Sequence, residues 1–333
     1  MSDPRFKGLV LRASGAQLIP AVEELGLEDL PAGEVLVKVS FSGINFKDAM
    51  AIGNRGIIRK FPAVPGIDLA GEVVSSEHPE HRAGDQVILT GWGMGERFWG
   101  GLSQYARVPG AGLLPLPAGM SARQAMAHGT AGLTAALCVA ALRQQGLRPE
   151  AGEVLVTGAT GGVGSIAVAL LAGLGFQVAA LTGKADQAGF LHRLGATRIV
   201  VRQGFDSPAK PGRFVLEPET YAAAVDTVGG ATLAAILARL NYGGSVAACG
   251  LVGGVELDSH VFPFILRGVS LLGIDSVRCP NPQRRAAWQT LAESFPAATL
   301  DLLTREIRLE QVVEAAAGIL AGQALGRLVV NLS

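Results

Sequence analysis

Between Glu153 and about Asp275, short apolar runs alternate with longer segments of helical character. The runs have the length of strands, and they are too continuously apolar for strands with one solvated face. Fully apolar strands separated by helices are typical of a parallel sheet covered on both faces. With right-handed crossovers, this pattern predicts a doubly wound, Rossmann-type α/β domain. The predicted strands are Val154–Thr157, Gln177–Thr182, Arg198–Val201, Ala222–Asp226, Ser245–Cys249 and Ser270–Ile274, and the predicted helices include Val163–Leu174 and Asp186–Leu194.

The first 120 residues have a different texture, in which many short strands are separated by turns rich in proline and glycine. Strand candidates lie in Gly33–Ser40 and Gly71–Val74, and they predict an irregular, mostly antiparallel β domain. Ser121 has the character of a helix N-cap. The tail holds two helices and the strands Arg305–Arg308 and Arg327–Asn331, and we expect it to return to the first domain. The predicted division is 1–125, 126–275 and 276–333.

Composition and charge narrow the function classes. The 333 residues carry 28 Lys+Arg against 28 Asp+Glu, and this balance argues against a nucleic-acid binder. Hydrophobic residues make up 49% and charged residues 17%, which favours a large buried core. No apolar run reaches the ~20 residues of a membrane span, and no signal peptide is expected. Three cysteines far apart in the sequence predict no disulfide framework, so we expect a cytoplasmic enzyme.

A glycine-rich loop is the strongest local motif. Thr157-Gly158-Ala159-Thr160-Gly161-Gly162-Val163-Gly164 leaves a predicted buried strand and opens a predicted helix. It has the form A-x-G-x-x-G rather than G-x-G-x-x-G. Glycines there let the backbone approach a pyrophosphate, and the helix N-terminus supplies N–H donors. The loop therefore predicts dinucleotide binding, and the alternative is a tight turn without a ligand.

The end of the second strand bears on the choice of cofactor. A site for NAD usually places Asp or Glu there, where the carboxylate binds the ribose 2′-hydroxyl. This chain has Thr182-Gly183-Lys184, with a hydroxyl and a cation instead. These groups suit a 2′-phosphate and predict NADPH as the cofactor. The alternative is that Lys184 is a solvated surface residue.

Seven segments together carry a resemblance to a known family. They are Gly43-Ile44-Asn45-Phe46-Lys47-Asp48, Phe61-Pro62-Ala63-Val64-Pro65-Gly66-Ile67-Asp68, Gly129-Thr130-Ala131-Gly132, Asn241-Tyr242-Gly243-Gly244, Ala248-Cys249-Gly250-Leu251, Pro263-Phe264-Ile265-Leu266-Arg267 and Gly273-Ile274-Asp275-Ser276-Val277. With the β-rich start, the central glycine loop and the returning tail, the chain resembles a medium-chain dehydrogenase/reductase over essentially its whole length. Within that superfamily it is similar to the quinone-oxidoreductase-like branch of the acryloyl-CoA reductase (YhdH/AcuI) type. The resemblance implies a GroES-like catalytic domain beside the Rossmann domain.

The resemblance also makes zinc a testable question. Zinc-dependent members of the superfamily have Cys where Asn45 stands and His where Ile67 stands, and neither residue here ligates zinc well. A structural zinc site would need four clustered cysteines, and the chain has three. The five histidines show no ligand spacing, and His128 has either a place by the cofactor or a packing role at a helix start. We therefore expect no metal.

The resemblance then implies hydride addition to an activated C=C bond, because without zinc alcohol oxidation lacks its Lewis acid. The expected reaction reduces an α,β-unsaturated acyl-CoA, such as acryloyl-CoA, and negative charge develops on its thioester oxygen. Asn45 and Lys47 are the candidate catalytic residues. The alternative is structural, with Asn45 capping a turn and Lys47 paired with Asp48. The family usually carries Tyr where Phe46 stands, so this position has lost its hydroxyl and the proton donor stays open.

Further contacts follow from the resemblance by position. Arg202 is expected to join Lys184 at the 2′-phosphate, and Arg55, Arg59 and Lys60 form a basic cluster that either binds CoA phosphates or is a solvated loop. The residues expected at the cofactor are Phe46, Thr130, Thr160, Gly161, Gly162, Val163, Thr182, Gly183, Lys184, Arg202, Leu251, Ile265, Ser276 and Arg327.

Two other functions stay open at this point. One is an NADPH-dependent reductase of quinones or alkenals, and the other is a non-catalytic NADPH-binding paralogue. A hydrolase is disfavoured, since no G-x-S-x-G motif occurs. Related reductases pair through the edge strand of the Rossmann sheet, so a homodimer formed near Ser270–Ile274 is expected.

Overall fold

A computed structural model describes residues 4–15, 17–206 and 216–333 of the chain, which divides into two compact units. Unit 1 consists of Met1–Thr130 and Leu300–Ser333, and unit 2 consists of Ala131–Thr299. The tail does return to the first unit, as the sequence predicted. It does so after Thr299 rather than after Asp275, because helix α7 (Asn281–Ser294) contacts helix α3 (Gly162–Gly173) of unit 2.

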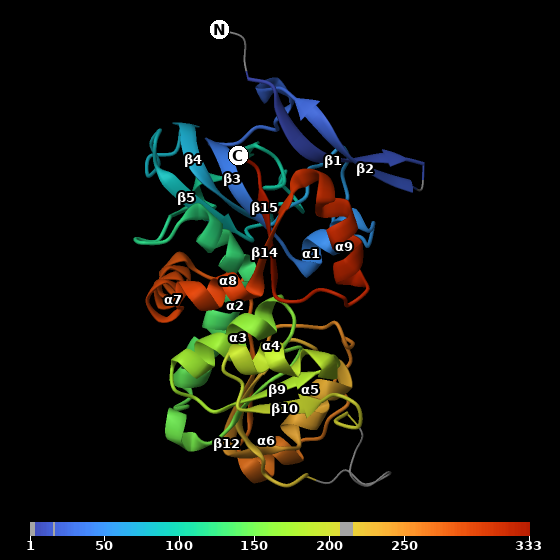
Figure 1. Ribbon diagram of the computed structural model, residues 1–333, viewed down its shortest axis with the longest axis vertical. Helices are drawn as coiled ribbons and strands as arrows, with labels where there is room; N and C mark the ends of the chain where they lie inside the picture. The colour runs from blue at the N-terminus through green and yellow to red at the C-terminus, as the bar shows by residue number, and fades with distance from the viewer. Residues whose placement is uncertain (1–3, 16, 207–215) are drawn as a thin grey trace. The chain divides into compact units, whose positions relative to one another are not determined.

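Unit 1 is built on antiparallel strands (Figure 1). A long hairpin pairs β1 with β2, and a second sheet has the order β14-β15-β3-β4-β5-β7, with β6 also paired to β3. The strands are β1 (Phe6–Ser14), β2 (Gln17–Leu25), β3 (Val35–Ile44), β4 (Asp68–Ser76), β5 (Gln86–Thr90), β6 (Tyr105–Val108), β7 (Leu114–Pro115), β14 (Thr304–Arg308) and β15 (Arg327–Asn331), and the helices are α1 (Phe46–Ile52) and α9 (Val312–Leu320).

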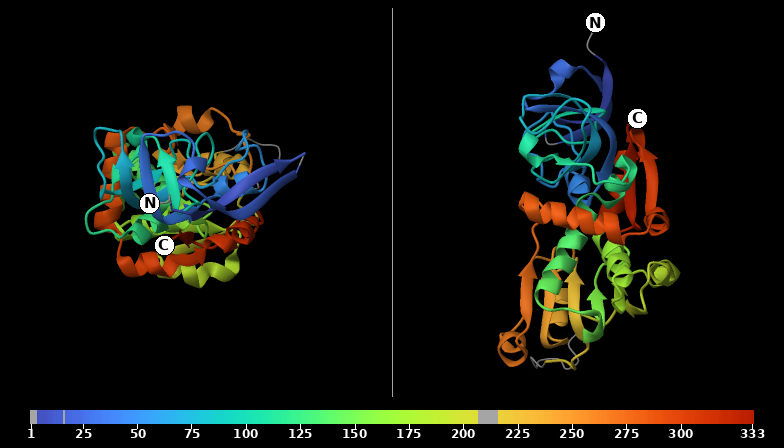
Figure 2. Two further views of the ribbon diagram at one scale, coloured as in Figure 1. Left: turned by 90° about the horizontal axis from the view of Figure 1, so that it is seen from above. Right: turned by 90° about the vertical axis from the view of Figure 1, so that its left-hand side faces the viewer.

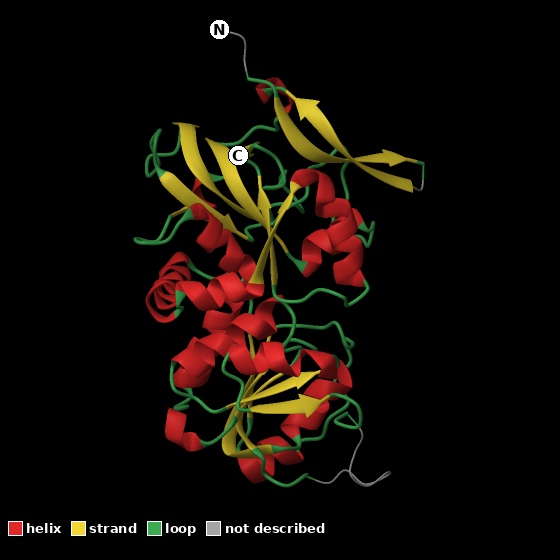
Figure 3. Cartoon of the chain, in the orientation of Figure 1, coloured by secondary structure: helices red, strands yellow, loops and turns green. Residues whose placement is uncertain are grey.

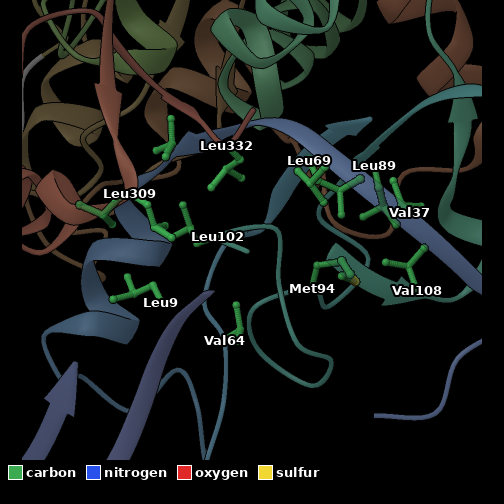
Figure 4. Packing of buried hydrophobic residues seen from close by; sticks show 14 of the residues in the cluster. Leu9, Val37, Val64, Leu69, Leu89, Met94, Leu102, Val108, Leu309 and Leu332 are labelled. Carbon is green, nitrogen blue, oxygen red and sulfur yellow. The ribbon is translucent and has the colours of Figure 1, made fainter. Parts of the chain in front are cut away.

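The C-terminal strands complete this sheet. β15 inserts between β14, which it pairs in parallel, and β3, which it pairs antiparallel. The C-terminal strands are red in Figure 2. The predicted strand Arg327–Asn331 is confirmed at both ends. The apolar faces of β1, β3, β4, β5 and the last residues of the chain enclose one core, part of which is shown in Figure 4 with Leu9, Val37, Leu89 and Leu332.

Unit 2 is a six-stranded parallel sheet with the order β10-β9-β8-β11-β12-β13, and helices cover its faces (Figure 3). The order reverses between β8 and β11, so the doubly wound Rossmann-type sheet is confirmed. The strands β8, β9 and β11 are buried along their whole length, which is why they are uniformly apolar in the sequence. The elements are β8 (Val154–Val156), β9 (Val178–Thr182), β10 (Arg198–Val201), β11 (Tyr221–Asp226), β12 (Leu240–Ala248), β13 (Ser270–Gly273), α3, α4 (Ala188–Arg193), α5 (Gly230–Leu237), α6 (Phe262–Arg267) and α7.

Helix α2 (Ala122–Gln144) crosses the boundary between the units in sequence, and α8 (Ala297–Leu303) crosses it back. Among the described residues, α2 is the one helix long and apolar enough to cross a membrane by composition, but most of its apolar window is buried in protein. It is also interrupted at Gly129, whose φ of 52° and ψ of −154° are not helical. α2 therefore has the properties of a core helix, and its second segment begins at Thr130.

Candidate functional site

Unit 1 contains a buried cluster of polar side chains at the start of α1. The chain leaves β3 at Ile44, and Asn45 is the N-cap of α1. Asp48, three residues later, accepts a hydrogen bond from the backbone N–H of Asn45 at 2.8 Å, as the N3 residue of a capping box does. Its other oxygen accepts the backbone N–H of Ile67 at 2.9 Å. Asp48 therefore ties the start of α1 to the segment that leads into β4.

The second carboxylate of this cluster is Asp68, the first residue of β4. Its Oδ2 accepts the amide of Asn45 at 2.7 Å and the backbone N–H of Thr130 at 2.8 Å. Its Oδ1 accepts the Thr130 hydroxyl at 2.6 Å. Asp68 thus holds the first residue of the second α2 segment and the N-cap of α1 together.

Arg327, at the start of β15, supplies the positive charge. Its guanidinium donates to the carbonyl oxygens of Ala127 at 2.9 Å and Ile44 at 3.2 Å, and to Oδ1 of Asn45 at 3.1 Å. Only 3% of the residue is exposed. Arg327 was expected to bind a cofactor phosphate, but in this structure its guanidinium serves unit 1 internally, and the phosphate contact stays a prediction.

Burial controls the electrostatics of this cluster. It raises the pKa of Asp48 to about 7, and the neighbouring charge of Asp68 acts in the same direction. Burial also raises the pKa of Asp68, against the hydrogen bonds from Thr130 and the charge of Arg327. The pKa of Arg327 is lowered by burial, and both carboxylates oppose that shift. Burial and the charge of Arg327 lower the pKa of the buried His128 to about 3, so its imidazole is neutral, and a place by the cofactor stays a prediction.

The hydrogen bonds decide between the two interpretations of Asn45. Its amide group donates to Oδ2 of Asp68 at 2.7 Å and to Oδ2 of Asp48 at 3.3 Å, and an amide has only two N–H donors. No donor is left for an oxygen of the substrate. The structure therefore corrects the expectation of a catalytic Asn45 and favours the alternative, in which this residue fixes the turn before α1.

Lys47 lies on a different face of α1. Its ammonium group donates to Glu96 at 3.1 Å, and about a third of each side chain is exposed. The expected alternative partner, Asp48, is instead buried and committed to backbone groups, so that pairing was wrong. An ammonium group has three donors, and one of them is used here. Phe46 precedes Lys47 and is 39% exposed, as an aromatic ring available to a ligand must be.

The glycine loop of unit 2 has the geometry that a dinucleotide requires. It follows β8, and Gly161 is the N-cap of the 12-residue helix α3. Gly158 has a φ of 56°, and a Cβ on Gly164 would overlap the carbonyl oxygen of Gly158. The first turn of α3 leaves backbone N–H groups without intrahelical partners. The residues that would face a pyrophosphate there are Thr160, Gly161, Gly162 and Val163.

Asp226 is a site residue that the sequence analysis missed. It ends β11, is fully buried, and accepts the Thr157 hydroxyl at 2.6 Å and the backbone N–H of Gly229 at 2.8 Å. Thr227 returns a hydrogen bond to the carbonyl oxygen of Thr157 at 2.9 Å. These bonds fix the start of the glycine loop to the neighbouring strand. The available signal was a carboxylate directly after an apolar strand.

The two cations expected at a 2′-phosphate do lie at one edge of the sheet. Thr182 ends β9 opposite Val201 of β10, and the backbone N–H of Arg202 donates to the carbonyl oxygen of Thr182 at 2.9 Å. The Thr182 hydroxyl accepts the backbone N–H of Lys184 at 2.9 Å. Partial burial lowers the pKa of Lys184, and the charge of Asp186 opposes that shift. A partly desolvated ammonium group favours an anionic ligand. Gly183, which lies between Thr182 and Lys184 in the sequence, has open space around its Cα.

The other expected contacts divide into two groups. Leu251, 57% exposed, follows β12, and Ser276 follows β13, so both lie at the carboxyl edge of the sheet with the glycine loop. Ile265 does not. It lies on α6, whose last residue, Arg267, donates to the carbonyl oxygen of Leu240 at the amino end of β12. The expected contact of Ile265 with the cofactor is therefore not supported, because the crossover has already returned to the opposite edge. The Thr130 hydroxyl donates a hydrogen bond to Asp68, and the expected contact of Thr130 with the carboxamide of the cofactor stays a prediction.

The cysteines and the metal question give two further results. The described cysteines are all free, and the nearby Cys249 thiol, together with burial, raises the pKa of the Cys138 thiol. No group of three or more His, Cys, Asp or Glu side chains in residues 4–15, 17–206 and 216–333 could hold a metal ion. At the zinc locus, the Asn45 amide is committed to two carboxylates and Ile67 is aliphatic. These residues do not fit zinc, and the expectation of no metal stays a prediction.

Comparison with known proteins covers both units. Residues 31–118 match the alcohol dehydrogenase GroES-like domain family, and residues 162–294 match the zinc-binding dehydrogenase family. The acrylyl-CoA reductase AcuI of Ruegeria pomeroyi is 51% identical over 94% of this chain and 94% of its own length. Crystal structures of two relatives were also found: the YhdH oxidoreductase of Salmonella enterica in complex with NADP (49% identity, TM-score 0.95, 98% and 100% coverage) and Bacillus subtilis YhfP with NAD bound (45% identity, TM-score 0.94, 99% and 100% coverage).

Proposed function

Because the chain belongs to the acrylyl-CoA reductase AcuI/YhdH family of quinone-oxidoreductase-like medium-chain dehydrogenases/reductases, we propose that it reduces the C=C bond of an α,β-unsaturated acyl-CoA with NADPH. The preferred substrate in this proposal is acryloyl-CoA, and the product is propanoyl-CoA. The observation that carries the proposal is the 51% identity to AcuI of Ruegeria pomeroyi over almost the whole of both chains.

The cofactor proposal rests on residues of unit 2. The loop Thr160–Val163 and the first turn of α3 would hold the pyrophosphate with backbone N–H groups. Lys184 and Arg202, at the ends of β9 and β10, would hold the 2′-phosphate, with Thr182 and Gly183 beside them. One relative was crystallised with NADP and another with NAD, so these two cations are the features that favour NADPH here. When bound, NADPH supplies a hydride to the β-carbon of the substrate.

Lys47 is the side chain that would meet the charge formed on the thioester oxygen. Its ammonium group keeps donors that Glu96 does not use, and Glu96 fixes its direction. Donors placed in advance at the developing negative charge usually contribute the largest share of catalysis. Asn45 contributes indirectly as a positioning residue, because it fixes the turn that precedes Phe46 and Lys47.

Phe46 would pack against the reacting groups without giving a proton. The side chains of Phe46 and Lys47 are partly exposed, so water reaches this end of α1. We propose that solvent supplies the proton that the α-carbon takes up, which completes the saturated thioester. The observation behind this step is the missing hydroxyl at position 46.

We further propose a cytoplasmic homodimer that forms through the edge of the unit 2 sheet. β13 is the edge strand, and Leu271 on it is partly exposed. Exposed apolar side chains continue through the preceding segment, where Val261, Ile265 and Leu266 are each more than half exposed. An apolar edge strand with an apolar surface beside it is a surface that a second copy would cover. Sedimentation should show a dimer, and Ile265→Glu should shift it to the monomer.

The reaction is tested by measuring NADPH oxidation with acryloyl-CoA, crotonoyl-CoA, a quinone and a free alkenal. The proposal expects the highest kcat/KM with acryloyl-CoA and propanoyl-CoA as the product. Faster turnover of the quinone or the alkenal would replace it with the other reductase activity. NADPH binding without turnover of any of the four would show a non-catalytic paralogue.

A further inference from the structure

A cationic loop follows α1 in unit 1 and is not used by the chemistry described above. Residues 53–60 read Gly-Asn-Arg-Gly-Ile-Ile-Arg-Lys, and no Asp or Glu occurs between Ala49 and Ile67. Arg55, Arg59 and Lys60 are all exposed. Among the described residues, none of the three side chains forms a hydrogen bond or an ion pair. The loop therefore presents three positive charges that its own unit leaves uncompensated.

Two isoleucines in the middle of the loop anchor it to the core of unit 1. Ile58 is buried in the unit 1 core and Ile57 packs against that core, between Arg55 on one side and Arg59 on the other. The backbone N–H of Arg55 donates to the carbonyl oxygen of Met50 at 2.9 Å, which fixes the loop to the end of α1. Three cations on an anchored loop lose less conformational entropy on binding an anion than cations on a free segment do.

A cavity opens at the same end of α1. Its volume is about 400 Å³, and it lies between α1, β2 and α9. Gly53 and Asn54, the residues before Arg55, line it together with Ile52, Pro20 and Ala317. The volume and the mainly aliphatic lining suit a flat, weakly polar ring system. The charged loop and the apolar cavity therefore share a boundary at Asn54 and Arg55.

We propose that this loop and cavity bind the 3′-phosphoadenosine diphosphate of coenzyme A, which rests on the proposed reduction of an acyl-CoA. The nucleotide carries a pyrophosphate and a 3′-phosphate beside an adenine ring. Arg55, Arg59 and Lys60 meet the phosphates, since arginine binds phosphate oxygens in a bidentate manner and lysine adds a point charge. The cavity takes the adenine.

The position of the loop along α1 agrees with this assignment. α1 has seven residues and is therefore about 10 Å long. Phe46 and Lys47 lie at its first turn, and the loop follows its last turn. The acyl end of the substrate and its nucleotide would thus lie at opposite ends of one helix. The pantetheine arm of CoA is the part of the molecule that would span the distance between them.

The test compares acryloyl-CoA with the acryloyl thioester of N-acetylcysteamine, which has the same reactive end and no nucleotide. In the variant Arg55→Glu/Arg59→Glu/Lys60→Glu, we expect kcat/KM for acryloyl-CoA to fall about 100-fold through a higher KM, because charge-assisted phosphate bonds are lost. The value for the truncated thioester should stay within about twofold of the unmodified protein. The matched control is Lys38→Glu/Arg82→Glu/Arg305→Glu, which changes the charge of unit 1 by the same amount at other exposed positions and should leave both values unchanged.

A second variant tests the cavity separately from the charges. Ala317 lies on the exposed side of α9, so Ala317→Phe fills the cavity without disturbing the core. It should raise the KM for acryloyl-CoA about tenfold and leave the truncated thioester unaffected. An equal loss for both thioesters in either variant, or no loss for either, would overturn the proposed subsite.

Direct binding separates this proposal from the proposed reaction. Calorimetric titration of the protein with CoA, with the dinucleotide site saturated by NADP, measures the subsite without turnover. If no enoyl-CoA is reduced but CoA binds and the triple loop variant abolishes binding, the subsite stands and the reaction fails. If acryloyl-CoA is reduced and the loop variants bind CoA as tightly as the unmodified protein, the reaction stands and the subsite is wrong.

Discussion

Replacing Asn45 separates a structural role from a catalytic one. The variant Asn45→Ala removes the hydrogen bonds to Asp68 at 2.7 Å and from Arg327 at 3.1 Å, together with a longer one to Asp48 at 3.3 Å. Hydrogen bonds to charged groups contribute about 1.5–3 kcal/mol each, and they are not additive within one network. Asn45 is only half buried, so water replaces part of what is lost. We expect a net loss of about 3 kcal/mol in the free energy of unfolding of unit 1.

The assay is thermal unfolding followed by circular dichroism, with steady-state kinetics on the same samples. For a unit of this size, about 3 kcal/mol lowers Tm by roughly 6–12 °C. Lys47→Met is the matched variant, because it removes a partly exposed ion pair that contributes about 0–1 kcal/mol. It should leave Tm nearly unchanged and lower kcat by about 10²–10³. An Asn45→Ala protein with the Tm of the unmodified protein and a kcat as low as that of Lys47→Met would refute this division of roles.

Three further predictions follow from the described contacts. Gly129→Ala should destabilise unit 1 by more than about 2 kcal/mol in urea unfolding, because a Cβ there would overlap Asp68 and lie 2.9 Å from Arg327. The control Gly119→Ala has a positive φ but open space around it, and it should cost about 1 kcal/mol. Equal losses in the two variants would contradict the steric account. The pKa of the Asp48 carboxyl is raised to about 7, so between about pH 4 and about pH 7 the folded chain holds a proton that the unfolded chain releases, and stability should fall as pH rises over this range. Asp48→Asn should flatten this pH dependence of the urea midpoint. A urea midpoint of the unmodified protein that rises over this pH range would contradict the prediction. Lys184→Ala/Arg202→Ala should raise the KM for NADPH about 10–100-fold and leave that for NADH nearly unchanged; a parallel rise in both would place the 2′-phosphate elsewhere.

The Rossmann-type sheet could be predicted from the sequence because its strands carry their signal locally. A strand buried on both faces, such as Val154–Val156, has no polar position to disguise it, and the residues that follow it, Gly158 and Gly161, mark the turn into a helix. The edge position of the strand near Ser270 came from the family resemblance, and the sheet order agrees with it. β9 and β10 are neighbours in this sheet, so Lys184 and Arg202 follow adjacent strands, and their joint contact with a 2′-phosphate stays a prediction.

The polar cluster of unit 1 could not be predicted in the same way. Asn45 and Asp48 have the spacing of an N-cap and its N3 partner, so one hydrogen bond was visible locally. The partners that commit the Asn45 amide come from Asp68 and Arg327, which are remote in the sequence and meet only through strand pairing. Sequence resemblance assigned Asn45 to a chemical role by its position. Its hydrogen bonds depend on the fold and assign it to a structural one.

Ile265 shows a second limit of reasoning by position. The predicted element was a connection between two parallel strands, and a connection leaves one edge of a sheet and returns to the other. Whether a given residue lies near the start or the end of that path depends on where the helix begins. The contact of Arg267 with Leu240 places α6 near the end, so Ile265 lies beyond the edge that carries the glycine loop.

The insertion of β15 between β14 and β3 has a consequence for synthesis on the ribosome. Arg327 bonds to Asn45, which emerges 282 residues earlier. At a translation rate of about 5–20 residues per second, that interval lasts roughly 15–60 s. During this time β3 exposes the backbone groups that β15 later occupies, and Asp68 has no guanidinium beside it. Unit 2 is continuous in sequence and is synthesised before β15, so it can fold while β15 is still missing. Unit 1 can complete its sheet only after β15 has emerged.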